Sequence, residues 1–382
     1  MRISQDRTDC ARQLCRGREL LLRAATTSGS EALPAFEAWR ASVDLDAAID
    51  AETLALMPLL YGTLQKLGRD DPLMGRLKGL CRRTWYENQI MLKGARGAAA
   101  CLAKAGVVPF LIGDLPLALA HHGTLSARRI GRVDFVVPAR QARLAADLLG
   151  LSNWSTGSPL RDEEVTYNHV KRFVAPAGQI LHLHWHFLEA ACSEDADEVF
   201  WTSGRGSALD LVPACHLSST GLLLHLLLGG SARDTEMPGL WIADALAVIG
   251  GDVGQLDWDR MTEFALRHRL AFRLRRKFEV LSDYGASVPV SAVRALRKAK
   301  ISLPEAIDAI VLRGQRRRPL RSPSWRFSVV ADYLRSGRRA GLSNRITDFP
   351  HFVRHRWGLK GRREILPLLV QHVLRTAAPG WT

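Results

Sequence analysis

Residues 128–138 of the chain read RRIGRVDFVVP, and this stretch decides the fold. Its apolar run from Val133 to Val137 has the length and composition of a buried strand. Pro138 follows directly, and proline is favoured at the first position of a helix, so we expect a helix from there through Leu149. Side chains two residues apart point to the same face of a strand, so Arg132 and Asp134 share a face.

The segments around this strand predict a small mixed module. Residues 107–112 (VVPFLI) form a short apolar run flanked by glycine, which indicates a buried strand. A short helix is expected at 114–122. Two further strands are expected at 165–174 and 179–187, joined by a tight turn at Pro176-Ala177-Gly178.

Helical patterns flank this module on both sides. The apolar spacing predicts helices in the ranges 14–22, 54–67, 77–102, 216–228, 240–249, 257–267 and 270–284. Asp257 is an expected N-cap. The fold class we predict is therefore α+β, a small mixed-sheet core flanked by N-terminal and C-terminal helical regions. The expected divisions are a helical bundle at 1–105, the α/β core at 106–212, a helical domain packed on the core at 213–300 and a basic, aromatic-containing segment at 301–382.

The charge of the chain is unusual. Its 382 residues include 53 Lys or Arg and 38 Asp or Glu, a net charge of +15 with a pI near 10.1. The segment Arg313–Arg363 holds 15 of the cations, interleaved with aromatic residues. This pattern favours an anionic partner, which could be nucleic acid, a membrane surface or an acidic protein. A solvated basic face is the alternative interpretation.

Several classes of protein are disfavoured. The first residues lack the apolar core of a secretory signal, and the six cysteines contain no CxxC pair, so we expect a cytoplasmic protein with reduced thiols. The longest apolar runs, such as 221–230, are too short for a transmembrane segment. The chain contains no GxSxG, Walker-type, GxGxxG or HExxH motif.

The mixed module has the layout of a site for nucleotidyl transfer. In such a site, acids at positions i and i+2 of one strand share a face and can bridge two divalent ions. A third acid on a neighbouring strand completes the metal site. A glycine at a strand–helix turn, here Gly113, lets the backbone approach a triphosphate.

These segments resemble the uncharacterised nucleotidyltransferase family, a branch of the polymerase-β-like superfamily. The family reads roughly L-K-G at its first strand, R-x-x-G-D-[IV]-D before an apolar run and proline at its second, and [VIL]-[DE]-L-H-W later. This chain reads LIG at 111–113, RRIGRVDFVVP at 128–138 and LHLHW at 181–185. WIAD at 241–244 resembles the W-h-x-D segment of the family. The resemblance covers about residues 30–290.

The departures from the family pattern fall at the metal site. Ile112 stands at the family lysine, Arg132 at the first metal-binding aspartate and His182 at the third carboxylate, so only Asp134 remains. What the resemblance implies is Asp134 as catalytic residue, and Mg2+ as cofactor if the protein is active, held weakly by Asp134 and His182. It implies a nucleoside triphosphate near Gly113, Asp114, Arg128 and Arg132, in a pocket with His182, His184 and Trp185.

Three functions follow from this pattern. The first is metal-dependent transfer of an NMP from an NTP to a hydroxyl acceptor, reduced or lost here because Arg132 and His182 replace carboxylates. The second is a non-catalytic scaffold that binds a nucleotide or a partner, with Arg132–Asp134 as a structural ion pair, and three replacements together favour it. The third is a transition-metal protein using His182, His184 and Asp134, with His186 alternating on the same strand face as the two histidines. His225 is interpreted as a core histidine.

Overall fold

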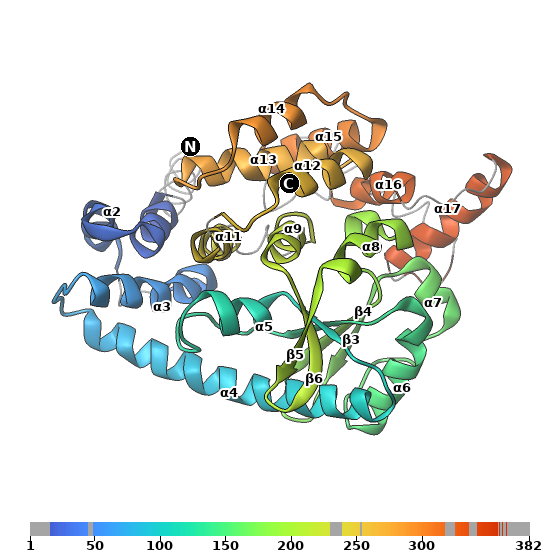
Figure 1. The fold of residues 1–382 in the computed structure, drawn as a ribbon, viewed down its shortest axis with the longest axis horizontal. Coiled ribbons are helices and arrows are strands. Elements are labelled where there is room, and N and C mark those ends of the chain that lie inside the picture. Colours follow the sequence, from blue (N-terminus) through green and yellow to red (C-terminus); the bar gives the residue numbers. More distant parts are fainter. Residues whose placement is uncertain are drawn as a thin grey trace, which may run out of the picture.

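The computed structural model describes residues 16–44, 49–229, 239–252, 254–317, 325–335 and 342–357, with 359, 361 and 364. The fold is α+β, with helices on both sides of one six-stranded mixed sheet (Figure 1). The strands lie in the order β3-β4-β2-β1-β6-β5. Their bounds are β1 Phe110–Ile112, β2 Val133–Val136, β3 Val170–Val174, β4 Ile180–His184, β5 Gly204–Leu209 and β6 Val212–Leu217.

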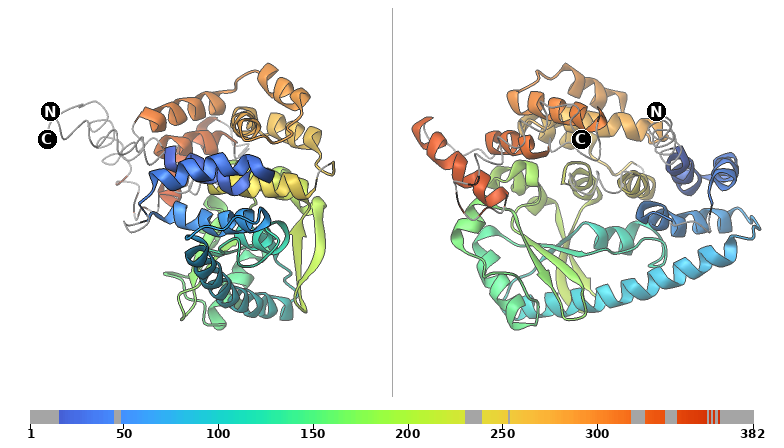
Figure 2. Two further views of the ribbon diagram at one scale, coloured as in Figure 1. Left: turned by 90° about the vertical axis from the view of Figure 1, so that its left-hand side faces the viewer. Right: turned by 180° about the vertical axis from the view of Figure 1, so that it is seen from behind.

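The helices before and within the sheet follow the apolar spacing of the sequence. Residues 16–26 are helical, and a 31-residue helix, α4, runs along one edge of the molecule (Figures 1 and 2). The bounds are α2 Ala32–Ser42, α3 Ala51–Lys66, α4 Met74–Lys104, α5 Asp114–Pro116, α6 Ala142–Leu151, α7 Asp162–Tyr167 and α8 Glu194–Ser203. Short 3-10 helices at Gly29–Glu31 and Ala139–Gln141 precede α2 and α6, and a π-helical turn at Leu117–His121 follows α5. A further 3-10 helix lies at Glu189–Ala191.

The remaining helices lie above one face of the sheet, opposite the face that α4 and α6 cover (Figure 1). Their bounds are α9 Ser219–Gly229, α11 Leu240–Gly251, α12 Trp258–Arg267, α13 Ala271–Asp283, α14 Val290–Lys298, α15 Leu303–Arg317, α16 Trp325–Arg335 and α17 Leu342–Arg356. Asp257 caps α12 as expected, because its side chain accepts a hydrogen bond from the Arg260 N–H at 2.8 Å. Within the described ranges, none of these helices combines the length and apolarity that crossing a bilayer requires.

Two expectations about secondary structure were wrong. Residues 162–167 form α7 instead of the start of a strand, because Asp162, Glu163 and Glu164 occupy its first turn and complement the helix dipole. The β5–β6 hairpin was missed, and the helix expected to begin at 216 begins at Ser219 because β6 continues through Leu217. The tight turn at 176–178 is present, with the Gly178 N–H bonded to the Ala175 carbonyl at 2.9 Å.

The two faces of the sheet have different surroundings. Alternate side chains such as Phe135, Leu181 and Leu183 are fully buried against α4 and α6 in one hydrophobic cluster. The opposite face carries Asp134, His182 and His184, and it faces a cavity below α9 and α11. The burial of one face fixes the register, so the polar side chains of β2 and β4 must face the cavity.

A second hydrophobic cluster holds the layers together. It contains side chains from α3, from β1 and β2, and from α9, α11 and α13. The division of the chain into four segments stays a prediction, and this cluster joins side chains from the first three of them. The cavity wall is thus built from elements far apart in the sequence.

Candidate functional site

A cavity of about 490 Å³ lies between the polar face of the sheet and the helices α3, α4, α9 and α11. Its volume is in the range of pockets that bind small molecules. Gly113, Asp114, Arg128, Arg132 and Asp134 all line it, as do His182 and His184. These residues come from three segments of the chain, and the sheet register brings them together.

Register explains why Asp134, His182 and His184 converge. β2 and β4 are parallel neighbours, and Asp134 lies opposite His182 while Val136 lies opposite His184. Asp134 is 1% exposed. Its Oδ1 atom lies 3.1 Å from Nε2 of His184 and 3.7 Å from Nδ1 of His182. Two imidazoles and one carboxylate therefore share a single point of the cavity wall.

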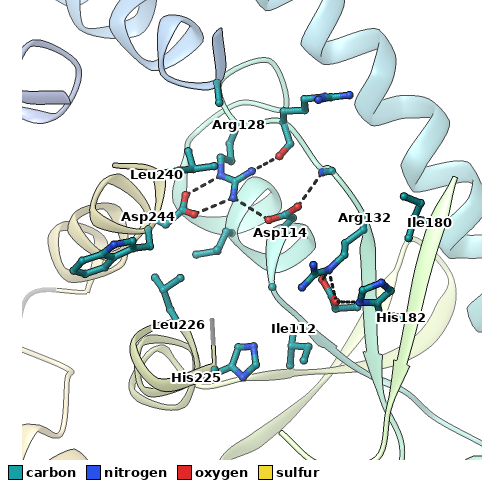
Figure 3. A pocket seen from close by; sticks show the side chains of 18 of the residues that line it. Ile112, Asp114, Arg128, Arg132, Ile180, His182, His225, Leu226, Leu240 and Asp244 are labelled. Carbon is teal, nitrogen blue, oxygen red and sulfur yellow. Dashed lines mark hydrogen bonds and ion pairs between the residues drawn. The ribbon is translucent and has the colours of Figure 1, made fainter. Parts of the chain in front are cut away.

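Arg132 occupies the space beside this carboxylate. Its Nε lies 2.7 Å from Oδ1 and 3.0 Å from Oδ2 of Asp134 (Figure 3). The Arg132 side chain keeps 30% of its surface exposed, whereas that of Asp134 keeps 2%. The expected Arg132–Asp134 pair is thus formed, and the rest of the guanidinium faces the cavity.

Gly113 permits the close approach of the β1–α5 turn to Asp134. Its φ of 69° and ψ of −134° fall in a region that side-chain-bearing residues rarely adopt. A Cβ at this position would lie 2.7 Å from Oδ2 of Asp134. The turn therefore packs on the carboxylate, and a side chain at position 113 would displace it.

A second charged centre lies deeper in the same wall. Arg128 is 4% exposed, and its guanidinium contacts both carboxylate oxygens of Asp244, each at 2.9 Å, and Asp114 Oδ1 at 2.9 Å (Figure 3). Asp114 Oδ2 also accepts the Gly131 N–H at 2.9 Å, and Nε2 of His122 lies 2.8 Å from Asp244 Oδ1. Burial alone would raise the pKa of Asp244, but the Arg128 charge outweighs it and lowers that pKa.

The loop that carries Arg128 is fixed to α4 by one side chain. The Asn88 amide donates to the carbonyls of Leu125 and Arg128 at 2.7 and 2.8 Å. Its oxygen accepts the Ile130 N–H at 2.7 Å. Asn88 is completely buried. The segment that leads into β2 is therefore held through the Arg128 side chain, by Asp114 and Asp244, and through its backbone, by Asn88.

The remaining histidines near the wall are held neutral. Burial lowers the pKa of His225, on α9, to about 4, helped by the nearby charge of His184. Burial and the charge of Arg356 lower the pKa of His169 well below its usual range. His225 lines the cavity, and its Nδ1 has no hydrogen-bond partner among the described residues.

Two expected site residues are placed elsewhere. Trp185 is not among the residues lining the cavity, because it packs in the cluster on the opposite face of the sheet. Its indole N–H bonds the carbonyls of Val165 and Asn168, each at 2.9 Å. His186 lies beyond the end of β4, and its Nδ1 bonds Asp197 of α8 at 2.6 Å. The three-histidine face is thus reduced to His182 and His184.

The cavity rim carries arginines that the sequence patterns did not single out. Arg83 and Arg129 both contact Glu87, with Nε–carboxylate distances of 2.8 and 2.9 Å. Burial alone would raise the pKa of Glu87, but these two arginines outweigh it and lower the pKa. Arg172, on β3 opposite His182, forms no ion pair or side-chain hydrogen bond within the described part of the chain. The signal that could have identified Arg172 was its position opposite His182 on the neighbouring strand, which places both side chains on the same face of the sheet.

The residues do not fit a pair of Mg2+ ions. Mg2+ takes oxygen ligands in octahedral geometry, and the three positions that would supply carboxylates hold Arg132, Asp134 and His182. The Arg132 guanidinium contacts the remaining carboxylate and repels a cation there. Asp134, His182 and His184 offer ligand atoms within 4.8 Å of one another, and such a set suits zinc or iron better than magnesium.

The comparisons with known proteins point to one family. A family model described as "Uncharacterised nucleotidyltransferase" matches residues 43–281. The chain belongs to this nucleotidyltransferase family. A crystal structure of an antigenic nucleotidyltransferase-like protein from Paracoccidioides brasiliensis is similar at 17% identity and a TM-score of 0.35, covering 53% of this chain and 96% of that one. No curated protein matches the chain.

Proposed function

We propose that this protein binds a nucleoside triphosphate in the cavity without conventional two-metal nucleotidyl transfer, and that Arg132 takes the place of a divalent cation. The observation that carries the proposal is the contact of Arg132 Nε with both oxygens of Asp134, at 2.7 and 3.0 Å. This contact uses one edge of the planar guanidinium and leaves the other nitrogen atoms toward the cavity. A guanidinium is well suited to bind phosphate oxygens.

The arrangement of charges in the cavity wall supports an anionic ligand. The acidic side chains Glu87, Asp114, Asp134 and Asp244 each contact an arginine. Five arginines and five carboxylates line the cavity, so its formal charge is balanced. The positive charge open to a ligand is the part of the Arg132 guanidinium that does not contact Asp134, together with Arg172, which forms no ion pair within the described part of the chain. Gly113 and the apolar residues Leu222 and Leu226 give the ligand a close backbone approach and an apolar surface for a base.

Nucleotide titration tests the proposal. Isothermal calorimetry with ATP, GTP, CTP and UTP, each with Mg2+, with Mn2+ and with EDTA, should give binding that EDTA does not abolish. Arg132→Ala should weaken that binding by about tenfold or more, because charge-assisted contacts to phosphate are lost. Arg143→Ala, which removes an exposed arginine paired with Asp162, should leave it unchanged.

Two results would oppose the proposal. Binding that requires Mg2+ or Mn2+ and disappears in Asp134→Ala would show that a rewired metal site persists and would make NMP transfer to a hydroxyl acceptor the better reading. Absence of binding for all four nucleotides would leave the fold as a scaffold for a partner.

Transition-metal binding is a second candidate, favoured by the convergence of Asp134, His182 and His184. Elemental analysis of the purified protein by mass spectrometry tests it. A stoichiometric metal that is lost in His182→Ala would support this function. A metal content unaffected by that substitution would exclude these residues as its ligands.

We also propose a cytoplasmic location. Its support is that Cys81, Cys101, Cys192 and Cys215 are free thiols, as in proteins kept in reducing compartments. Cell fractionation with an antibody to the protein tests this.

A further inference from the structure

The helix α4 presents an exposed face that mixes cations with aromatic rings. Trp85 is 51% exposed and Tyr86 is 63% exposed, and Ile90 beside them is 37% exposed. Lys78, Arg82 and Lys93 are exposed on the same helix. At 100° per residue, positions 78, 82, 85, 86, 89 and 93 fall on one side of the helix. Two aromatic rings therefore lie on the same side of the helix as three cations, in a row that runs from Lys78 to Lys93.

No ion pair among the described residues neutralises the three cations Lys78, Arg82 and Lys93. Glu87 is the sole acidic residue in the sequence of α4, and it is held by Arg83 and Arg129. From Lys78 to Lys93 the row is ~22 Å long, at 1.5 Å per residue. The surface therefore carries three uncompensated charges over the length of several nucleotides.

The opposite side of α4 is committed to the core. Leu92, Ala95, Ala99 and Leu102 are buried in the cluster beneath the sheet. A helix that lies on a membrane uses a broad apolar face for insertion. The apolar face of α4 is consumed by packing, so its exposed face cannot insert in that manner. Charge and stacking remain as the means of recognition.

In the segment first expected to bind an anionic partner, the aromatic side chains that the structure describes pack internally. Tyr333, Phe349 and Phe352 pack together between α16 and α17, and Tyr167 of α7 stacks on His355 at 5.1 Å between ring centroids. Arg354 pairs with Glu163 at 2.7 Å, and Arg356 bonds the Glu189 carbonyl at 2.8 Å. Within the Arg313–Arg363 segment, residues 318–324, 336–341, 358, 360, 362 and 363 lie outside the described residues, as do the side chains of 313–317, 325–328 and 342–347.

We propose that the exposed face of α4 is a binding surface for a single strand of nucleic acid. Lys78, Arg82 and Lys93 contact phosphates along the strand. Trp85 and Tyr86 stack on bases, an interaction that accepts any base because every base has a π face. The surface is separate from the polar sheet face of the cavity, so its function does not depend on the nucleotide proposed there.

Fluorescence anisotropy of the full chain with a labelled 12-nucleotide single-stranded RNA tests the surface. Trp85→Ala with Tyr86→Ala should weaken binding by about tenfold or more and leave its salt dependence unchanged, because stacking but no charge is lost. Lys78→Ala, Arg82→Ala and Lys93→Ala together should weaken binding and reduce the slope of log K against log salt by about 2, as three phosphate contacts are removed.

Matched controls separate this surface from general charge. Arg294→Ala, Lys298→Ala and Lys300→Ala remove three exposed cations in and just after α14, which lies across the molecule from α4 (Figure 1). Leu151→Ala with Leu211→Ala removes two exposed apolar side chains, which are 84% and 96% exposed. Both control variants should bind the RNA as the wild type does. Thermal unfolding should show that all four variants remain folded.

Three results would overturn the proposal. One is equal loss of binding in the α4 and α14 charge variants, which would mean attraction by net charge alone. Another is unchanged binding after removal of Trp85 and Tyr86. The last is RNA that does not bind while vesicles containing phosphatidylserine do, with the same dependence on Lys78, Arg82 and Lys93. A single-stranded DNA of the same sequence that binds equally would support recognition by phosphate and stacking.

Discussion

Arg128 and Arg132 lie four residues apart, and each contacts carboxylates, yet their surroundings differ. Arg128 is enclosed, with Asp114 and Asp244 on its two sides and a backbone carbonyl, that of Arg129, on a third nitrogen. Arg132 contacts Asp134 through one nitrogen and keeps 30% of its side chain exposed. The difference teaches that Arg128 is a structural element because all three of its nitrogens are bonded within the protein, whereas Arg132 keeps nitrogens that are available for the ligand proposed above.

Substitution of Arg128 should have the largest effect. Arg128→Met leaves Asp114 and Asp244 buried without their cation, so the free energy of unfolding should fall by about 3–5 kcal/mol. Arg132→Met should cost less, because His182 and His184 remain beside the buried Asp134 carboxylate and Arg132 itself is partly exposed. Urea unfolding of both variants measures the difference. Equal losses for the two would abolish the distinction between the centres.

The pH dependence of stability should distinguish the titration of His225, which lines the cavity, from that of Asp244, which contacts Arg128. The folded-state pKa of His225 is about 4, below its unfolded value near 6.5, so its contribution is present above pH 6.5 and lost as pH falls through 4. The free energy of unfolding should drop by roughly 3 kcal/mol across that window. Asp244 has a lowered pKa, so its contribution is lost only at more acidic pH.

Unfolding by urea at a series of pH values checks this expectation. His225→Leu should reduce the fall between pH 6.5 and 4, leaving the part that His169 contributes through its own lowered pKa, and should leave the fall below pH 4 in place. A slope as steep in His225→Leu as in the wild type would assign the titration to other groups.

Substitution of Gly113 tests how closely the β1–α5 turn packs against the Arg132–Asp134 pair. Gly113→Ala should cost about 1–3 kcal/mol from backbone strain and should displace Asp134, whose Oδ2 would lie 2.7 Å from the new Cβ. Gly106→Ala is the matched control, because Gly106 has a φ of 71° with no atom within 4 Å of a Cβ. Both variants should lose stability, and Gly113→Ala alone should lose nucleotide affinity. Equal affinities would remove the turn from the binding site.

The smallest effect is expected from a double substitution that restores, around Asp134, the carboxylates of the family pattern. Arg132→Asp with His182→Asp places carboxylates on both sides of Asp134, and affinity for Mn2+ should rise by about tenfold, equal to 1.4 kcal/mol. Calorimetric titration with Mn2+ measures it. Adding Asp134→Asn should reverse the gain. A double variant that binds no more Mn2+ than wild type would mean that more than these two side chains prevents metal binding.

Local signals predicted much of the fold. The α+β class, the strand of Asp134 and the cap at Asp257 followed from apolar spacing and capping chemistry. The β5–β6 hairpin did not, because its sequence holds Gly204, Gly206 and Pro213 where strands usually have β-branched residues. Its strand character comes from pairing with β1, which no local pattern contains.

The site was predictable only where register settles it. Asp134 and Arg132 share a strand face, and their pairing followed from a spacing of two residues. The partner of Arg128 lies 116 residues away, at Asp244, so sequence spacing could not show that this arginine is consumed by the scaffold. Interleaved cations and aromatic residues were equally ambiguous, because burial and not composition distinguishes α17 from α4.

Asn88 has a consequence for how such chains can vary. Its side chain serves two carbonyls and one N–H in a space with no water contact. Aspartate would set a charge against those carbonyls, leucine would leave three polar groups unsatisfied, and glutamine is one methylene too long. One amino acid of twenty meets these demands. Substitution of Asn88 should therefore be rarer among related chains than substitution of Arg132 or His182. Asn88 should identify related chains even where the metal ligands have changed.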